Sequence, residues 1–310
     1  MHAAPISRPA VARPGVARLR RWLGGSYAPY LFVAPPFLFF AAFILYPLLY
    51  ALRLSFTYWH GAGTPRPVGF SNYAFLLTDS GFWGSIATSA ILWALIIPAQ
   101  TIFAILAAVL LSGSTLRFRW FFRTAFLVPF VVPLVAVAQI WLIIFDPDVG
   151  MVNNLLQVAH LGPVPWLTDG AWVRPVLASL VLWKNSGFAI ILMLAGLQGI
   201  PQELYEAAAI DGATAFVQFW RITMPLMRRI ITFFVVTSTI GVIQMFAEPF
   251  VLFNRGGGPN NAAVTAGYNL YLYISSQDLG TGAANSFLLL ALLVVVSLVM
   301  LRLLRAREEA

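Results

Sequence analysis

Charged residues are scarce in this 310-residue sequence. Only 10% of the residues are Asp, Glu, Lys or Arg, whereas 60% are hydrophobic. A soluble domain carries about 25% charged residues and keeps them on its surface, so a soluble fold could not bury this much apolar surface. The same composition excludes a disordered chain, a collagen-like chain and a small disulfide scaffold. The sequence therefore predicts an integral membrane protein.

Cysteine is absent, and lysine occurs once. Without cysteine, the chain has no disulfide framework, no thiolate metal site and no cysteine nucleophile. A nucleotide-binding P-loop requires Gly-Lys-[Ser/Thr], but the single lysine, Lys184, stands between Trp183 and Asn185. The chain therefore has no Walker A motif. If ATP drives its activity, another polypeptide must hydrolyse it.

The motifs of membrane enzymes are also missing. The three histidines, His2, His60 and His160, all lie outside the long apolar stretches. The sequence has no His-Glu-x-x-His motif, no Asp-rich diphosphate motif and no pair of aspartates within an apolar stretch. Nothing in the sequence therefore supports an enzyme, and no metal site is expected.

Six apolar stretches are long enough to cross a bilayer as helices, which takes about 20 residues each. We expect spans at residues 28–52, 83–111, 124–145, 175–200, 230–253 and 281–301, within a transmembrane domain of residues 26–304. The polar segment 1–25 is expected to be a disordered tail, and 305–310 a second short tail. No cleaved signal peptide is expected, because the first apolar stretch has full membrane length.

The arginines indicate the orientation of these spans. Five lie in the N-terminal tail, and three lie in each of the loop after span 2, the loop after span 4 and the C-terminal tail. The loops on the other side hold Arg66, Arg174 and Arg255, with Arg53 at the border. By the positive-inside rule, both termini are expected to be cytoplasmic.

The cytoplasmic loop 201–229 has the pattern of a helical hairpin. Pro201 suits the first position of a helix, and the alanines that follow favour a helix. Asp211-Gly212 is expected to break it, because glycine permits the backbone of a bend. A second short helix should carry Phe219 and end at Pro225. Such a hairpin could bind a partner, or it could lie on the membrane surface without one.

The residues of this loop resemble a known signature. Glu206-Ala207-Ala208-x-x-Asp211-Gly212-Ala213, followed by Phe219-x-x-Ile222-x-x-Pro225, is similar to the EAA motif of ABC importer permeases. The resemblance is to the carbohydrate-uptake branch, which includes the maltose and glycerol-3-phosphate permeases. Met224 replaces the usual leucine before the final proline. Further similar segments are Val68-Gly69-x-x-Asn72-Tyr73, Gly196-Leu197-Gln198-x-Ile200-Pro201 and Gly257-Gly258-Pro259.

The resemblance implies an all-α fold of six membrane helices, the type I importer permease fold. It implies half of a pore completed by a second, distinct permease subunit in the cytoplasmic membrane of a bacterium or archaeon. A separate ATPase dimer would carry ATP and Mg, and an extracytoplasmic binding protein would deliver the substrate. No cofactor is expected on this chain. The implied ATPase-coupling residues are Glu203, Glu206, Ala207, Ala208, Asp211, Gly212 and Phe219.

Two ionisable residues fall inside the spans, Lys184 and Glu248. Such groups cost about 2.5–3.5 kcal/mol at the helix centre and are functional candidates by default. They could pair with each other, line a polar cavity or serve the structure alone, Lys184 by snorkelling. Gln244 precedes Glu248 by four residues, which would place both on one helical face. The expected substrate pathway, partly by alignment with the maltose permease, is Trp183, Lys184, Asn185, Phe188, Ile243, Gln244, Phe246 and Glu248.

The sequence thus predicts a permease subunit of an ATP-driven importer for a sugar or oligosaccharide. A phosphorylated polyol such as glycerol-3-phosphate is the second choice of substrate, because Lys184 could meet a phosphate. A secondary transporter that acts alone is the alternative from another class, but the EAA-like loop would then have no purpose.

Overall fold

The computed structural model describes residues 28–113, 118–253 and 256–305. Within these residues the regular elements are helices, apart from one antiparallel pair of two-residue strands, β1 (Thr57–Tyr58) and β2 (Arg66–Pro67). The expected disordered tail, residues 1–25, lies outside the described residues. The chain divides into two units, Met1–Leu54 and Ser55–Ala310, and each is described separately.

The first unit contains one candidate membrane span, Tyr30–Leu54. It consists of α2 (Ala28–Phe40), a π-helical turn η1 (Ala41–Leu45) and α3 (Tyr46–Leu54). The π-helical turn ends two residues before Pro47. A proline in a helix lacks a donor and its ring clashes with the carbonyl four residues earlier, and a wider turn relieves this clash. The apolar helix therefore continues through the proline.

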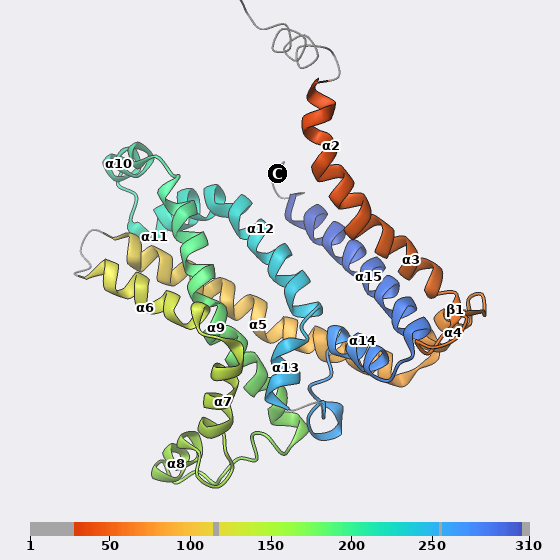
Figure 1. Ribbon diagram of the computed structural model, residues 1–310. Helices are drawn as coiled ribbons and strands as arrows, with labels where there is room; N and C mark the ends of the chain where they lie inside the picture. The colour runs from red at the N-terminus through yellow and green to blue at the C-terminus, as the bar shows by residue number, and fades with distance from the viewer. Residues whose placement is uncertain (1–27, 114–117, 254–255, 306–310) are drawn as a thin grey trace, which may run out of the picture. The chain divides into compact units, whose positions relative to one another are not determined.

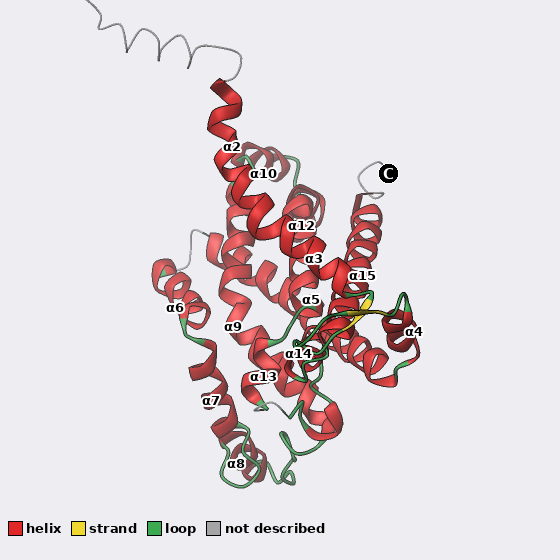
Figure 2. Ribbon diagram, turned by 45° about the vertical axis from the view of Figure 1, so that its right-hand side comes forward, coloured by secondary structure: helices red, strands yellow, loops and turns green. Residues whose placement is uncertain are grey.

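The second unit holds the remaining helices (Figures 1 and 2). They are α4 (Ser71–Thr78), α5 (Ser80–Ser112), α6 (Arg119–Val131), α7 (Leu134–Ile144), α8 (Met151–Val158), α9 (Gly170–Gln198), α10 (Gln202–Ile210), α11 (Ala215–Gln218), π-helical η2 (Phe219–Thr223), α12 (Met224–Ile243), α13 (Ala247–Leu252), 3₁₀-helical η3 (Pro259–Asn261), α14 (Ala266–Ser275) and α15 (Leu279–Arg305).

The centre of this unit is formed by α5, α9 and α12, which pack against one another. One part of the core gathers Leu92 and Leu177 around Trp141, and the other gathers Ile190 and Met227. Both views place α10 and α8 at opposite ends of the unit (Figures 1 and 2). Burying apolar side chains between long apolar helices in this way leaves few positions at which a polar group can be tolerated.

Glycine allows α6 to lie directly on α9. A Cβ built on Gly187 of α9 would lie 1.9 Å from the carbonyl oxygen of Phe126 in α6. No side chain can occupy that space, so the two backbones are in contact there. Small residues that let backbones approach closely are typical of helix interfaces in membranes.

The third expected span, 124–145, is not one straight helix. It consists of α6 and α7, which meet at an angle of 96°. The chain between them is extended at Val132 and Pro133, with ψ angles of 134° and 136°. Pro133 cannot donate to the helix, and it disfavours the helical conformation of the residue before it. The structure thus has five unbroken candidate spans, and six if this bent pair counts as one.

The prediction that Pro225 ends the second helix of the cytoplasmic loop is wrong. Residues Ala215–Ile243 form one candidate span of 29 residues. Pro225 lies in the first turn of α12, directly after the π-helical turn η2. As at Pro47, the wider turn accommodates the proline ring. The helix then ends at Ile243, and α13 is a separate short helix, whereas we expected one span over 230–253.

Polar side chains fasten the loops and short helices of the second unit. Asn153, only 1% exposed, donates to the carbonyls of Pro147 and Val164 and accepts from the indole of Trp166 at 2.8 Å. Asp79 caps α5 and accepts from the hydroxyl of Tyr273 at 3.3 Å. Burial and the neighbouring Asp79 raise the pKa of Tyr273 to about 12.

The contact at Gly187 leads to a stability prediction. Gly187→Ala should lower the thermal unfolding midpoint of the purified protein, because the new methyl group must push α6 away from α9 at a cost of about 1–3 kcal/mol. Gly84→Ala is the matched control, since a Cβ there meets no atom within 4 Å. Equal midpoints for the two variants would contradict the close approach.

Candidate functional site

The helical hairpin at one end of the second unit begins with α10. Pro201 is the N-cap residue, just before the helix, one position earlier than expected. Glu203 lies in the first turn of α10, where a carboxylate interacts favourably with the helix dipole. The side chains of Tyr205 and Thr223 are hydrogen-bonded at 2.8 Å. This bond fastens α10 to the start of the long helix that follows.

The turn of the hairpin depends on Gly212, whose φ is +80°. The amide of Ala213 donates to the carbonyl of Ala208 at 2.8 Å, and the amide of Gly212 donates to Ala209 at 3.1 Å. These bonds form the glycine-dependent ending typical of helices. Thr214 then caps α11 by accepting from the amide of Val217. The Asp211-Gly212 break expected from the sequence is therefore present.

The hairpin, defined here as residues 202–218 and called the coupling hairpin, has no buried residue in either helix. Ile210 is 88% exposed and Phe216 is 72% exposed. Of the expected coupling residues, Glu203, Glu206, Ala207, Asp211 and Gly212 are exposed, and Ala208 is half-buried. Phe219 differs, because it is half-buried against the core around Ile190 and Met227. Exposed apolar side chains beside carboxylates form a surface suited to a protein partner.

A polar cleft of about 240 Å³ lies between α5, α6, α9, α12 and α13. Its polar lining residues are Gln100, Asn185, Ser238 and Glu248. The other lining residues are Phe130, Val181, Phe188, Phe234, Gly241, Val242 and Met245. The rings of Phe130 and Phe188 are stacked with centroids 5.5 Å apart. Amide, hydroxyl and carboxylate groups beside aromatic rings can hydrogen-bond and stack on a polyhydroxylated molecule.

Three of the expected pathway residues line this polar cleft: Asn185, Phe188 and Glu248. Trp183 lies elsewhere. It lines a second cavity, of about 620 Å³, beside α6, and its ring packs on Trp141 with centroids 5.1 Å apart. Ile243 is buried among Ala266, Leu289 and Leu293.

Phe246 packs against the rings of Phe250, Tyr268 and Tyr271. Gln244 is exposed at the end of α12, where it is the C-cap residue. The expectation that Gln244 and Glu248 share one helical face is wrong, because the helix ends between them and Glu248 belongs to α13. α14 passes close to this turn: a Cβ on Gly267 would lie 2.3 Å from the carbonyl oxygen of Gln244.

Lys184 contacts backbone carbonyls. Its Nζ donates to the carbonyl oxygen of Val132 at 2.8 Å and to that of Phe130 at 3.3 Å. Both acceptors belong to the end of α6, where the third span is broken. Lys184 is not among the residues that line the polar cleft.

Gln100, Ser238 and Phe130 were not expected from the sequence. Gln100 is only 3% exposed and is the one side-chain amide in the 33 residues of α5. A lone glutamine in an apolar span is a signal that could have identified it, because buried amides are costly without partners. Ser238 offers no such signal, because α12 also carries three threonines, and Phe130 is one of 25 phenylalanines.

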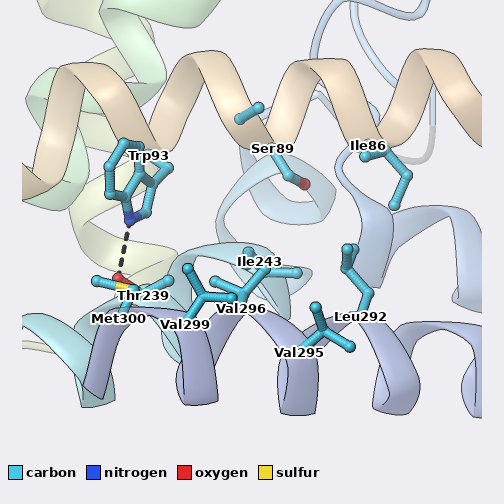
Figure 3. A pocket seen from close by; sticks show the side chains of 11 residues that line it. Ile86, Ser89, Trp93, Thr239, Ile243, Leu292, Val295, Val296, Val299 and Met300 are labelled. Atoms are coloured by element: carbon cyan, nitrogen blue, oxygen red, sulfur yellow. Dashed lines mark hydrogen bonds between the residues drawn. The ribbon is translucent and has the colours of Figure 1, made fainter. Parts of the chain in front are cut away.

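An apolar pocket of about 360 Å³ lies between α5, α12 and α15. Its lining includes Trp93, Ser89 and Thr239 (Figure 3). The indole of Trp93 donates to Thr239 at 2.8 Å, Thr239 donates to the carbonyl of Val235, and Ser89 accepts from the amide of Ala266. The remaining lining residues are Ile86, Ala90, Ile243, Leu292, Val295, Val296, Val299 and Met300. Because its polar side chains already have partners, this pocket is poorly suited to a polar ligand.

Across the described parts of the chain, no three His, Cys, Asp or Glu side chains gather as metal ligands would.

Comparison with known proteins identifies the family. Residues 100–308 match the model of the family described as "Binding-protein-dependent transport system inner membrane component". A lactose transport system permease of Rhizobium radiobacter is 35% identical over 247 residues, which cover 79% of this chain and 81% of that protein. An arabinooligosaccharides transport system permease of Bacillus subtilis is 32% identical over 301 residues, 94% of each chain.

A solved structure shares the fold. A chain in the crystal structure of a bacterial ABC transporter involved in the import of the acidic polysaccharide alginate superimposes with a TM-score of 0.80. The match has 23% sequence identity and covers 93% of this chain and 99% of that one. The expected all-helical importer-permease fold is thereby confirmed.

The family inferred from the EAA-like residues is thus confirmed by the family model and by the sequence relatives. The family description implies a binding protein and an ATPase as partners. The chain is a multi-pass transport subunit and not itself an ATPase. It belongs to the binding-protein-dependent transport system inner membrane components, the permease subunits of ABC importers.

Proposed function

We propose that this chain forms half of the translocation pathway of an ATP-driven importer for a neutral sugar or oligosaccharide, with the polar cleft as its substrate-contacting part. The observation that carries this proposal is the combination of Gln100, Asn185, Ser238 and Glu248 with the stacked pair of Phe130 and Phe188. The names of the relatives, which include lactose and arabinooligosaccharides, support the same substrate class.

The coupling hairpin is the proposed ATPase contact. Its two helices are solvent-exposed, and the exposed carboxylates of Glu203 and Glu206 can meet basic side chains of a partner. We place the hairpin and both termini on the cytoplasmic side, because the arginine-rich segments share that side. A second, distinct permease completes the pore, two ATPase subunits bind the two permeases, and an extracytoplasmic protein delivers the sugar.

A phosphorylated polyol fits this cleft less well than a neutral sugar. A phosphate would require a positive side chain at the cleft, but Lys184 is hydrogen-bonded to the end of α6. The cleft instead contains the carboxylate of Glu248. A transporter acting alone would leave the exposed coupling hairpin without a role.

The proposal is tested with the assembled transporter. The chain is co-expressed with the ATPase, second permease and binding protein encoded beside it, reconstituted in nanodiscs, and assayed for ATP hydrolysis with lactose, maltotriose, arabinotriose and glycerol 3-phosphate. Stimulation by a neutral sugar only in the presence of the binding protein supports the proposal. Stimulation by glycerol 3-phosphate alone, or uptake without an ATPase, contradicts it.

The coupling hairpin generates a second prediction. Glu206→Arg should reduce ATPase co-purification and uptake at least about tenfold, because a reversed charge at an interface costs several kcal/mol. Asp148→Arg is the matched control: the same charge reversal at an exposed position near α8, at the other end of the unit. Unchanged co-purification for Glu206→Arg would show that α10 is not the docking site.

The polar cleft generates a third prediction. Gln100→Leu should lower uptake about tenfold while the complex still assembles, because one substrate hydrogen bond to a buried amide is worth roughly 1 kcal/mol or more. Thr101→Val is the control on the neighbouring residue, whose hydroxyl donates within its own helix to the carbonyl of Ile97. Wild-type uptake by Gln100→Leu together with reduced uptake by Thr101→Val would contradict the prediction. The substrate would then contact the face of α5 that carries Thr101 rather than the face that carries Gln100.

A further inference from the structure

The break in the third span exposes backbone carbonyls. In an uninterrupted helix, the carbonyls of Phe130 and Val132 would accept from the amides of Leu134 and Ala136. Here the chain is extended at Val132 and Pro133, so those bonds are lost. An unsatisfied carbonyl at membrane depth is costly, so such a break is tolerated only where protein or a water-filled cavity surrounds it. A donor from elsewhere in the protein can replace the lost bonds.

Lys184 supplies this partner from α9. Its Nζ lies 2.8 Å from the carbonyl oxygen of Val132 and 3.3 Å from that of Phe130. A lysine has three donors and no acceptor, so one side chain can satisfy both carbonyls. The carbonyls at the end of a helix also carry its negative partial charge, which a cation stabilises.

A second contact fixes the same helix. Gly187 follows Lys184 by three residues, which puts both on one face of α9. The backbone of α6 touches α9 at Gly187, as shown by the 1.9 Å separation between a built Cβ and the Phe126 oxygen. The last turns of α6 are thus held on α9 by backbone packing at Phe126 and by hydrogen bonds at the break.

This anchoring determines where Phe130 lies. Phe130 provides one of the two carbonyls bound by Lys184, and its ring stacks on Phe188 at 5.5 Å in the wall of the polar cleft. Asn185, the residue after Lys184, lines the same cleft. One lysine therefore connects the bend of the third span to the shape of the cleft.

We propose that Lys184 is a positioning residue of the transport pathway: it holds the break between α6 and α7 against α9 and thereby keeps Phe130 in the cleft wall, without contacting the substrate. The link to transport depends on the proposed function of the cleft. The link to the bend does not, so the two parts can be tested separately.

The bend is measured with two spin labels. The chain contains no cysteine, so Val128→Cys in α6 and Ile143→Cys in α7 give one specific label pair within it, and any cysteines of the partner subunits are replaced before labelling. Both side chains are more than half exposed, at 54% and 69%, so the labels do not disturb the core. A straight helix would separate these residues by about 22 Å along its axis, and the 96° bend shortens this distance.

Double electron–electron resonance measures the distance between the two labels in the assembled transporter, in nanodiscs and without substrate. It is recorded for the labelled protein with the native Lys184 and for the same protein with Lys184→Met, Lys184→Gln or Lys184→Arg. We expect a longer and broader distance distribution for Lys184→Met, and the original distribution for Lys184→Arg, which keeps a cationic donor. Lys184→Gln keeps a neutral hydrogen-bond donor. Its label distance is compared with that of the native protein if the Lys184→Met complex fails to assemble. Asn185→Leu, the matched neighbour, should leave the distances unchanged while lowering uptake.

Uptake separates positioning from direct binding. For Lys184→Met we expect a maximal rate about tenfold lower, with recovery in Lys184→Arg. Unchanged distances in Lys184→Met overturn the proposal. So does a rise in the half-saturating concentration alone, or a loss of stimulation by glycerol 3-phosphate alone, since both indicate a substrate ligand. If the wild-type complex transports no sugar, the proposed function fails, but the distance measurement still decides the role of Lys184 at the bend.

Discussion

Backbone carbonyls within the hydrocarbon layer of a membrane must find donors inside the protein, and this constraint underlies the arrangement of the helices. A regular helix satisfies it through its own backbone hydrogen bonds, and prolines and breaks leave carbonyls that need another solution. At Pro47 and Pro225, a π-helical turn just before the proline lets the helix continue. At Val132 and Pro133 the helix breaks, and the freed carbonyls are hydrogen-bonded by Lys184. The one lysine of the chain thus stands where a strong, multiple donor is most needed.

The same constraint distinguishes the apolar pocket from the polar cleft. In the apolar pocket, the polar groups of Trp93, Ser89 and Thr239 are bonded to protein partners (Figure 3), and the pocket wall is left apolar. In the polar cleft, an amide from α5, an amide from α9, a hydroxyl from α12 and a carboxylate from α13 converge. Polar side chains are rare within membrane spans, and those that occur there usually face a pathway for polar molecules. The convergence of four such side chains on one cleft agrees with that role.

Patterns with strong local causes were predictable from the sequence. The apolar stretches indicated the spans, and Asp211-Gly212 indicated the turn of the coupling hairpin, because only a residue that tolerates positive φ fits there. The ends and bends of the helices were less predictable. Pro225 was expected to stop a helix that in fact continues, whereas Pro133 lies at a full break of the third span. The effect of a proline depends on whether the preceding turn can widen or a neighbouring side chain can cap the gap.

The candidate site depended on tertiary structure in the same way. Asn185, Phe188 and Glu248 were expected in the pathway and line the polar cleft. Gln244 was expected to share a helical face with Glu248, but the helix ends between them, where Gly267 lies close to the Gln244 carbonyl. Gln100 and Phe130 joined the cleft from α5 and α6. The spacing of residues within α9 or α12 does not indicate which side chains of the neighbouring helices face them.

The continuity of residues 215–243 has a mechanical consequence. A helix of 29 residues at about 1.5 Å per residue is a rod roughly 43 Å long. One end of this rod emerges from the coupling hairpin, and Ser238, Gly241 and Val242 near the other end form part of the cleft wall. Under the proposed function, a partner that displaces the hairpin would therefore move a helix that reaches the cleft wall without an intervening loop.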